Sequence, residues 1–164
     1  MIKKVVKKLK ENALFLILMA IVVTLCSIFF VTTISGESMC DTYKDGEIVF
    51  CTRIFDLERK DVIVCDSDEG RRLIKRVIAV GGDTIDIEDG KVFINGRRRK
   101  EQYLKEKITD LPENAQEFPM TIPEGKIFVM GDNRNHSTDS RDTQCGLISE
   151  ENVIGKVLFK VPPF

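Results

Sequence analysis

The stretch "RRLIKRVIAVGGDTIDIEDGKVFING", residues 71–96, alternates apolar and polar side chains along successive short runs. A period of two places neighbouring residues on opposite faces of an extended strand, so residues 71–80 predict one strand. A Gly-Gly-Asp turn ends that run. Asp89-Gly90 then lies between two further alternating runs, and this pair favours the tight type I′ turn of a β-hairpin. The stretch therefore predicts a strand followed by a hairpin.

Similar short runs on both sides extend the β prediction over most of the chain. They are "GEIVFCTRI" (46–54), "DVIVC" (61–65), "GKIFVMGD" (125–132) and "NVIGKVLFKV" (152–161). Residues 101–122 contain two prolines and mixed charges, which indicates an excursion over the surface. Many short strands separated by turn residues predict a mostly β domain whose antiparallel sheet is barrel-like.

An uncharged segment precedes this β region and extends from Asn12 to Gly36. A bilayer core of about 30 Å requires about 20 apolar residues in a helix, which this segment provides. A cleavable secretory signal also begins with lysines, but its apolar part is only about 7–15 residues long. The sequence therefore predicts a transmembrane signal anchor over residues 13–35.

The distribution of charge orients this anchor. Residues 1–12 carry five lysines against Glu11, a charge of +4, which leaves −5 for the rest of a chain whose total is −1. Lysines next to a membrane span stay in the cytoplasm, so we expect residues 1–12 inside and residues 36–164 outside the cell membrane. An acidic folded part lacks the basic footprint of a nucleic-acid-binding protein, so no nucleic-acid partner is expected.

Ser38 and Lys75 are the first candidates for chemistry. Ser38 follows the apolar segment directly, and Lys75 shares one strand face with Leu73 and Val77. If that face is buried, the charged ammonium is disfavoured and the pKa of Lys75 falls, by up to about 3–5 units in full burial. A neutral lysine can take a proton from a serine and activate it as a nucleophile. A lysine on an edge strand with its head group in solvent is the alternative.

The single histidine offers a second arrangement. His136 lies in "GDNRNHSTDSRD" (131–142), so a triad of Ser38, His136 and Asp139 is conceivable. The pattern alone leaves Lys75 and His136 open as the base. The five cysteines form no CxxC motif, and with one histidine they indicate no zinc site.

Three motifs resemble the sequence boxes of bacterial type I signal peptidases. They are "SGESM" followed by Thr42, "RLIKRVIAVGGD" and "GKIFVMGDNRNHSTDSRD", in this order behind an apolar anchor. The resemblance covers nearly the whole chain after the lysine-rich start. It implies the antiparallel, β-barrel-like catalytic domain of that family after one transmembrane helix, in a minimal, Gram-positive-like form.

The resemblance also implies roles for individual residues. Ser38 would be the nucleophile and Lys75 the general base, with Ser137 hydrogen-bonding the lysine to orient it. The positions that match structural ion pairs or loop supports near the site are Asp132, Arg134, Asp139 and Arg141. The positions that match the pocket for small substrate side chains are Ile34, Met39 and Ile74.

Two positions depart from the family pattern. Gly36 stands where some members have a serine whose hydroxyl helps to stabilise the oxyanion. Asp41 stands where the family usually has proline, and a nearby negative charge would raise the pKa of Lys75. These departures leave open a catalytically weak or inactive signal-peptidase-like binding protein or chaperone for exported proteins.

The sequence thus predicts a membrane-anchored serine endopeptidase that needs no metal or organic cofactor. The resemblance implies that it removes signal peptides from exported preproteins after small-x-small sites, in contact with membrane lipid and in association with the secretion machinery. A self-cleaving Ser–Lys regulator is a third hypothesis, although such proteins carry a DNA-binding segment where this chain has its apolar run.

Overall fold

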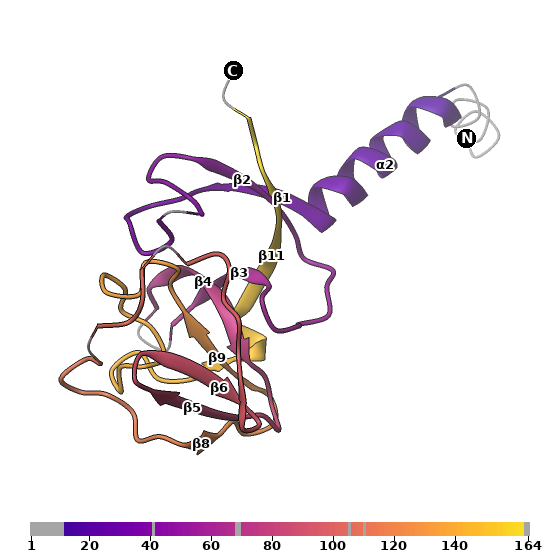
Figure 1. The fold of residues 1–164 in the computed structure, drawn as a ribbon. Helices are drawn as coiled ribbons and strands as arrows, with labels where there is room; N and C mark the ends of the chain where they lie inside the picture. The colour runs from indigo at the N-terminus through magenta and orange to yellow at the C-terminus, as the bar shows by residue number, and fades with distance from the viewer. Residues whose placement is uncertain (1–11, 41, 68–69, 105, 110, 163–164) are drawn as a thin grey trace.

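The computed structural model describes residues 12–40, 42–67, 70–104, 106–109 and 111–162. These residues form one helix followed by a mostly β domain of two antiparallel sheets (Figure 1). The fold class predicted from the alternating runs is therefore confirmed for the β domain.

The larger sheet has seven strands in the order β1-β2-β11-β3-β4-β9-β10 and is curled. Its strands are β1 (Phe29–Thr33), β2 (Ile48–Thr52), β3 (Val62–Asp66), β4 (Arg72–Ala79), β9 (Lys126–Met130), β10 (Ile148–Ser149) and β11 (Val153–Lys160). A short 3-10 helix, η1 (Glu150–Asn152), joins β10 to β11. The interior strand β4 pairs with β3 on one side and β9 on the other, and it carries Lys75.

The smaller sheet contains the predicted hairpin and has the order β7-β6-β5-β8. Its strands are β5 (Thr84–Glu88), β6 (Lys91–Ile94), β7 (Arg97–Arg98) and β8 (Met120–Thr121). Asp89 and Gly90 at the hairpin turn have φ values of 47° and 68°, the positive φ that a type I′ turn requires. The hairpin is therefore present as predicted.

The segment predicted as a surface excursion, residues 101–122, is mostly irregular but contributes to the core. Ile108 and Ile122 are buried against the hairpin sheet together with Phe128 of β9. A side chain at Gly90 would collide with the carbonyl oxygen of Ile108, so the segment packs directly on the hairpin turn.

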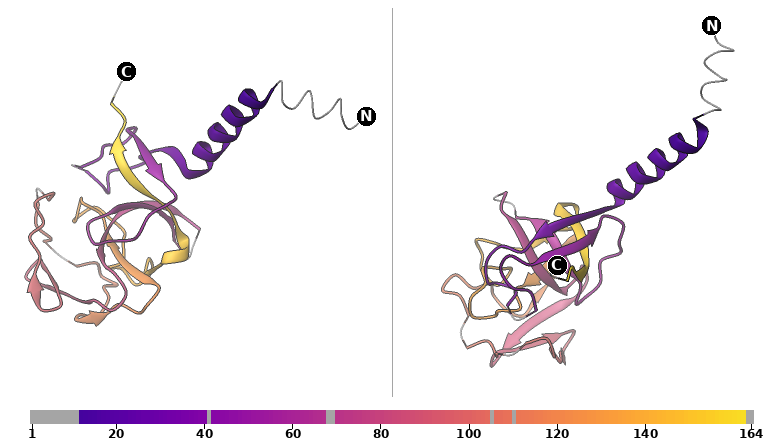
Figure 2. Two further views of the ribbon diagram at one scale, coloured as in Figure 1. Left: turned by 90° about the vertical axis from the view of Figure 1, so that its right-hand side faces the viewer. Right: turned by 90° about the horizontal axis from the view of Figure 1, so that it is seen from above.

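The N-terminal region differs from the prediction of one continuous span over residues 13–35. The helix α2 (Ala13–Ile28) ends at Ile28, and residues 29–33 form β1, which pairs with β2 from Phe29↔Thr52 to Thr33↔Ile48. The sequence "FFVTT" consists of aromatic and β-branched residues, which favour a strand once a partner strand is available. Among the described residues, no helix combines the length and apolar character needed to cross a membrane. Figure 2 shows α2 projecting away from the β domain.

Candidate active site

Ser38 lies on a tight turn between β1 and β2. The N–H of Ile34 donates to the carbonyl of Glu47 at 2.8 Å, and the carbonyl of Ile34 accepts from the N–H of Gly46 at 2.9 Å. The N–H of Cys40 donates to the carbonyl of Glu37 at 3.0 Å. Gly36 has φ +85°, a conformation that side-chain-bearing residues rarely adopt, and its N–H donates to Asp45 Oδ1 at 2.7 Å. The glycine that departs from the family pattern therefore makes the bend before the serine.

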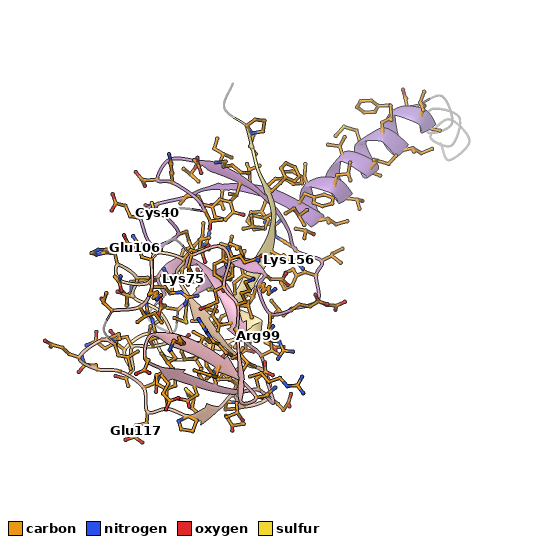
Figure 3. All side chains as sticks on the ribbon, viewed as in Figure 1. Cys40, Lys75, Arg99, Glu106, Glu117 and Lys156 are labelled. Carbon is orange, nitrogen blue, oxygen red and sulfur yellow. The ribbon has the colours of Figure 1, made fainter. Side chains whose placement is uncertain are left out.

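Lys75 lies inside the β domain with only 3% of its surface exposed (Figure 3). Its Nζ donates a hydrogen bond to Ser38 Oγ at 2.7 Å, although the two residues are far apart in sequence. Burial lowers the pKa of the Lys75 amine from its ordinary value of 10.5, and the negative charge of Asp139 opposes part of this change. The structure thus brings together a buried amine and the hydroxyl that sequence analysis proposed as its partner.

His136 is exposed and does not join this pair. Within the described part of the chain, no hydrogen bond links His136 to Ser38 or to Asp139. Asp139 instead accepts from Arg141 Nε at 2.8 Å and Nη2 at 2.9 Å, and from the N–H of Gly131 at 2.9 Å. The alternative triad is therefore not assembled in this structure.

The pair Asp139–Arg141 is buried and bidentate, which is the strongest arrangement of these two side chains. Arg141 also donates to the carbonyl of Ser137 at 3.4 Å. These contacts fix the loop after β9, the role that the resemblance implies for this ion pair.

Ser137 differs from the expectation based on the resemblance. Its Oγ is buried but has no hydrogen-bond partner among the described residues, so the expected bond to Lys75 is not formed here. Sequence analysis missed the reason why Ser137 and Ser38 lie so close, which is Gly131. A Cβ at Gly131 would collide with the hydroxyl of Ser137 and the carbonyl oxygen of Ser38. The glycine at position 131, inside a motif rich in candidate site residues, was the signal in the sequence that could have indicated this close approach.

A second buried ion pair connects the two segments that carry Ser38 and Lys75. Arg76, adjacent to Lys75, donates to both oxygens of Asp132 at 2.8 and 2.6 Å. Thr42, four residues after Ser38, donates its hydroxyl to Asp132 Oδ2 at 2.5 Å. Asp132 therefore joins the nucleophile turn to β4, and sequence analysis had assigned no such role to Arg76.

Arg134 extends this network to the segment after β7. Its guanidinium donates to Glu101 at 3.0 and 2.6 Å and to the carbonyl of Gly131 at 3.0 Å. Tyr103 donates to Glu101 at 2.8 Å, and its ring lies 4.1 Å from the guanidinium carbon of Arg76. Glu101 and Tyr103 were missed because long-range ion pairs leave no local sequence pattern.

The three predicted pocket residues lie together in one apolar cluster. Ile34 and Met39 are 3% and 1% exposed, and the partly buried Ile74 packs against them. Ile74 is on β4 directly before Lys75, so this cluster borders the Ser38–Lys75 pair.

The cysteines form no disulfide among the described residues, and burial weakens the reactivity of three of them. Burial raises the pKa of Cys65 to about 12 and of Cys51 and Cys145 to about 11 each. Thiols with such values are poor nucleophiles at neutral pH. No three His, Cys, Asp or Glu side chains within the described ranges come together as a metal site requires.

A curled β domain with a buried Ser–Lys pair is an arrangement suited to a serine peptidase that works without histidine. Residues 5–161 match the model of the family described as "Signal peptidase, peptidase S26". The chain therefore belongs to the bacterial type I signal peptidases, a family of serine peptidases.

Individual relatives agree with this assignment. The chain is 39% identical to Signal peptidase IB of Staphylococcus aureus (strain Mu50), over 80% of this chain and 77% of that protein. It is 35% identical to Signal peptidase I of Bacillus licheniformis, over 94% of this chain and 92% of that protein. The crystal structure of a signal peptidase I from Enterococcus faecalis V583 is 34% identical, with a TM-score of 0.53, covering 65% of this chain and 99% of that chain.

Proposed function

We propose that this chain is a membrane-anchored endopeptidase that removes signal peptides from exported preproteins, with Ser38 as nucleophile and Lys75 as general base. The observation that carries the proposal is the 2.7 Å hydrogen bond between Lys75 Nζ and Ser38 Oγ, made by an amine whose pKa is lowered by burial. A neutral amine at this distance can receive the serine proton. Its relatives named as signal peptidases support the choice of substrate.

Acylation begins when Ser38 Oγ attacks the scissile carbonyl carbon. The hydroxyl proton passes to Lys75 as the Oγ–C bond forms, and the carbonyl oxygen becomes an oxyanion. The collapse of this intermediate breaks the C–N bond, and the protonated Lys75 donates its proton to the leaving amine of the mature protein. The signal peptide then remains attached to Ser38 as an ester.

Deacylation repeats these steps with water. The neutral Lys75 takes a proton from a water molecule, which attacks the ester carbon. The C–Oγ bond breaks, Ser38 recovers its proton from Lys75, and the signal peptide leaves with a free carboxylate. One lysine thus serves as base and acid in both halves of the reaction.

The oxyanion would be stabilised by the N–H of Ser38. Gly36 provides no side-chain donor, and its own N–H is already committed to Asp45, so a further donor comes from another group such as Ser35. We assign Ser137 to the orientation of Lys75, because its buried hydroxyl has a bonding capacity that no described residue satisfies. Asp41 lies outside the described residues, and its effect on the lysine stays a prediction.

The cluster of Ile34, Met39 and Ile74 would line the shallow apolar pockets for the small side chains of the cleavage site. These residues border the Ser38–Lys75 pair and are packed in the core. The pockets that they line therefore cannot easily widen to admit large side chains. The steric limit accounts for the preference for small residues that the family resemblance implies.

We further propose that the apolar segment that contains α2 anchors the chain in the cell membrane, with residues 1–12 in the cytoplasm and the β domain outside. Every residue of α2 is outside the protein core, including Leu14 and Phe15 at 71% and 62% exposure. Val31 of β1 and Phe159 of β11 are also exposed, at 60% and 53%. Exposed apolar side chains in this number are stable when lipid covers them.

Cleavage of a preprotein with an Ala-x-Ala site in lipid vesicles tests this proposal. The native chain would be compared with Ser38→Ala, Lys75→Met and His136→Ala. We expect cleavage to be lost in the first two variants and retained in the third. Loss with His136→Ala but not with Lys75→Met would overturn the dyad. Binding of the preprotein without cleavage by the native chain would favour the binding-protein alternative.

A further inference from the structure

We propose that Asn133 is a positioning residue that aims the N–H of Ser38 at the oxyanion. This inference rests on the proposed function, because it concerns the donor that stabilises the intermediate of that reaction. Asn133 belongs to the loop after β9, and no step of the mechanism above uses it.

Asn133 holds the nucleophile turn at two consecutive carbonyl groups. Its backbone N–H donates to the carbonyl of Ser38 at 3.0 Å, and its side-chain Nδ2 donates to the carbonyl of Glu37 at 3.1 Å. The carbonyl of Glu37 also accepts from the N–H of Cys40 at 3.0 Å, which closes the turn. The peptide group between Glu37 and Ser38 is thus fixed by one contact within the turn and one from outside it.

The carbonyl of Glu37 and the N–H of Ser38 belong to the same planar peptide group. In a trans peptide these two bonds point in opposite directions, so any contact that fixes the carbonyl also fixes the N–H. Among the described residues, no backbone hydrogen bond uses the N–H of Ser38, which leaves this donor for a ligand oxygen. Glu37 itself is exposed, so protein packing adds little to hold this peptide.

The position of Asn133 is itself rigidly determined. The preceding residue, Asp132, is held by Arg76 through a bidentate ion pair, and the following residue, Arg134, is held by Glu101. Both flanking side chains are fully buried, at 0% exposure. Two buried ion pairs therefore fix the backbone from which the side-chain amide reaches Glu37.

A substitution at Asn133 would distinguish its backbone bond to Ser38 from its side-chain bond to Glu37. Asn133→Ala retains the backbone bond to Ser38 and removes only the side-chain bond to Glu37. Removing an oxyanion donor outright costs about 10²–10³ in rate, and misdirecting one costs less, so we expect kcat to fall roughly 10- to 100-fold. KM should stay near the native value, because the substitution removes a hydrogen bond to the nucleophile turn and changes no pocket side chain.

Asn135 provides a matched control in the same loop. Its side-chain amide accepts from Thr109 and donates to the carbonyl of Lys107 at 3.1 Å, so it holds a segment other than the nucleophile turn. Asn135→Ala removes an equivalent amide from the same loop. It should leave kcat and KM at native values.

The test measures preprotein cleavage in vesicles together with inhibition by a peptide aldehyde that ends in alanine. Ser38 Oγ adds to the aldehyde carbon, the serine proton passes through Lys75 to the former carbonyl oxygen, and that oxygen occupies the oxyanion position. We expect Asn133→Ala and Asn133→Asp to lower kcat and aldehyde affinity by similar factors, with KM unchanged and Asn135→Ala native-like.

Two results would overturn the inference alone: a native kcat in Asn133→Ala, or a loss of kcat in both Asn133→Ala and Asn135→Ala with native aldehyde affinity. The second result would mean that Asn133 only supports the loop. A native chain that neither cleaves the preprotein nor binds the aldehyde would overturn the proposed function as well, so the two failures are distinguishable.

Discussion

At the scale of the residue, Lys75 combines burial with a hydrogen bond to the hydroxyl of Ser38. An amine in the core is less stable in its charged form than one in water, which is why burial lowers the pKa of Lys75. The same burial makes the lysine available as a base at lower pH than an exposed lysine, and it lowers the stability of the fold. Function and stability therefore conflict at this one side chain.

This conflict gives a pH-dependent difference in stability. Between the lowered pKa of folded Lys75 and its ordinary value of 10.5, the unfolded chain binds a proton that the folded chain does not. The stability of the native chain therefore rises with pH across this window, and the full destabilisation persists below it. Lys75→Met has no such group.

We expect the stability of Lys75→Met relative to the native chain to be greatest below the lowered pKa of Lys75. This difference should decrease as the pH rises towards 10.5, as measured by denaturant unfolding in detergent. A difference that does not change with pH would indicate that Lys75 titrates alike in the folded and unfolded chains.

Gly131 provides a second prediction for a single residue. Gly131→Ala would force its new methyl group against the hydroxyl of Ser137 and the carbonyl of Ser38. Because a displacement of about 1 Å at a catalytic group can cost about 10² in rate, we expect at least this loss of kcat. Overpacking should also cost about 1–3 kcal/mol of stability. Native cleavage by Gly131→Ala would show that the close approach around Gly131 is unnecessary.

At the scale of the element, the sequence predicts what depends on local periodicity. The strand β4 and the β5–β6 hairpin follow from alternation and from Asp89-Gly90, and both are present. The strand β1 was not predicted, because "FFVTT" is as apolar as the segment before it and forms a strand only by pairing with β2. The choice of Lys75 as the partner of Ser38 depended on the family resemblance, since no local pattern indicates a contact between segments far apart in the sequence.

The segment after β7 should stabilise the loop after β9 through the contact of Glu101 with Arg134. Its carboxylate accepts two hydrogen bonds from Arg134, whose side chain has no exposed surface. Glu101→Gln leaves this buried cation without its counter-charge, which typically destabilises a protein by about 3–5 kcal/mol. Denaturant unfolding measures the loss.

Glu106→Gln is the control for this change, because Glu106 lies in the same segment and is exposed (Figure 3). It should alter stability by no more than about 0.5 kcal/mol. Equal stabilities for Glu101→Gln and Glu106→Gln would contradict a structural role for the Glu101–Arg134 pair.

At the scale of the whole molecule, the apolar helix and the catalytic domain have separate tasks. No residue of α2 is buried, so a chain that begins at Phe29 should retain the β domain. We expect this shortened chain to leave the vesicle fraction and to cleave a short soluble peptide with native kcat. Its cleavage of a vesicle-bound preprotein should fall, because enzyme and substrate no longer share the membrane. Retention on vesicles would assign membrane binding to the β domain instead.

The pH dependence of preprotein cleavage tests the central claim, that neutral Lys75 activates Ser38. It would be measured as kcat/KM in vesicles from about pH 6 to about pH 10, for the native chain beside Lys75→Met and Ser38→Ala. The account predicts a rate that rises with pH through a pKa below 10.5, and no cleavage by either variant. Cleavage by Lys75→Met with the native pH profile would contradict it, because another group would then have to be the base.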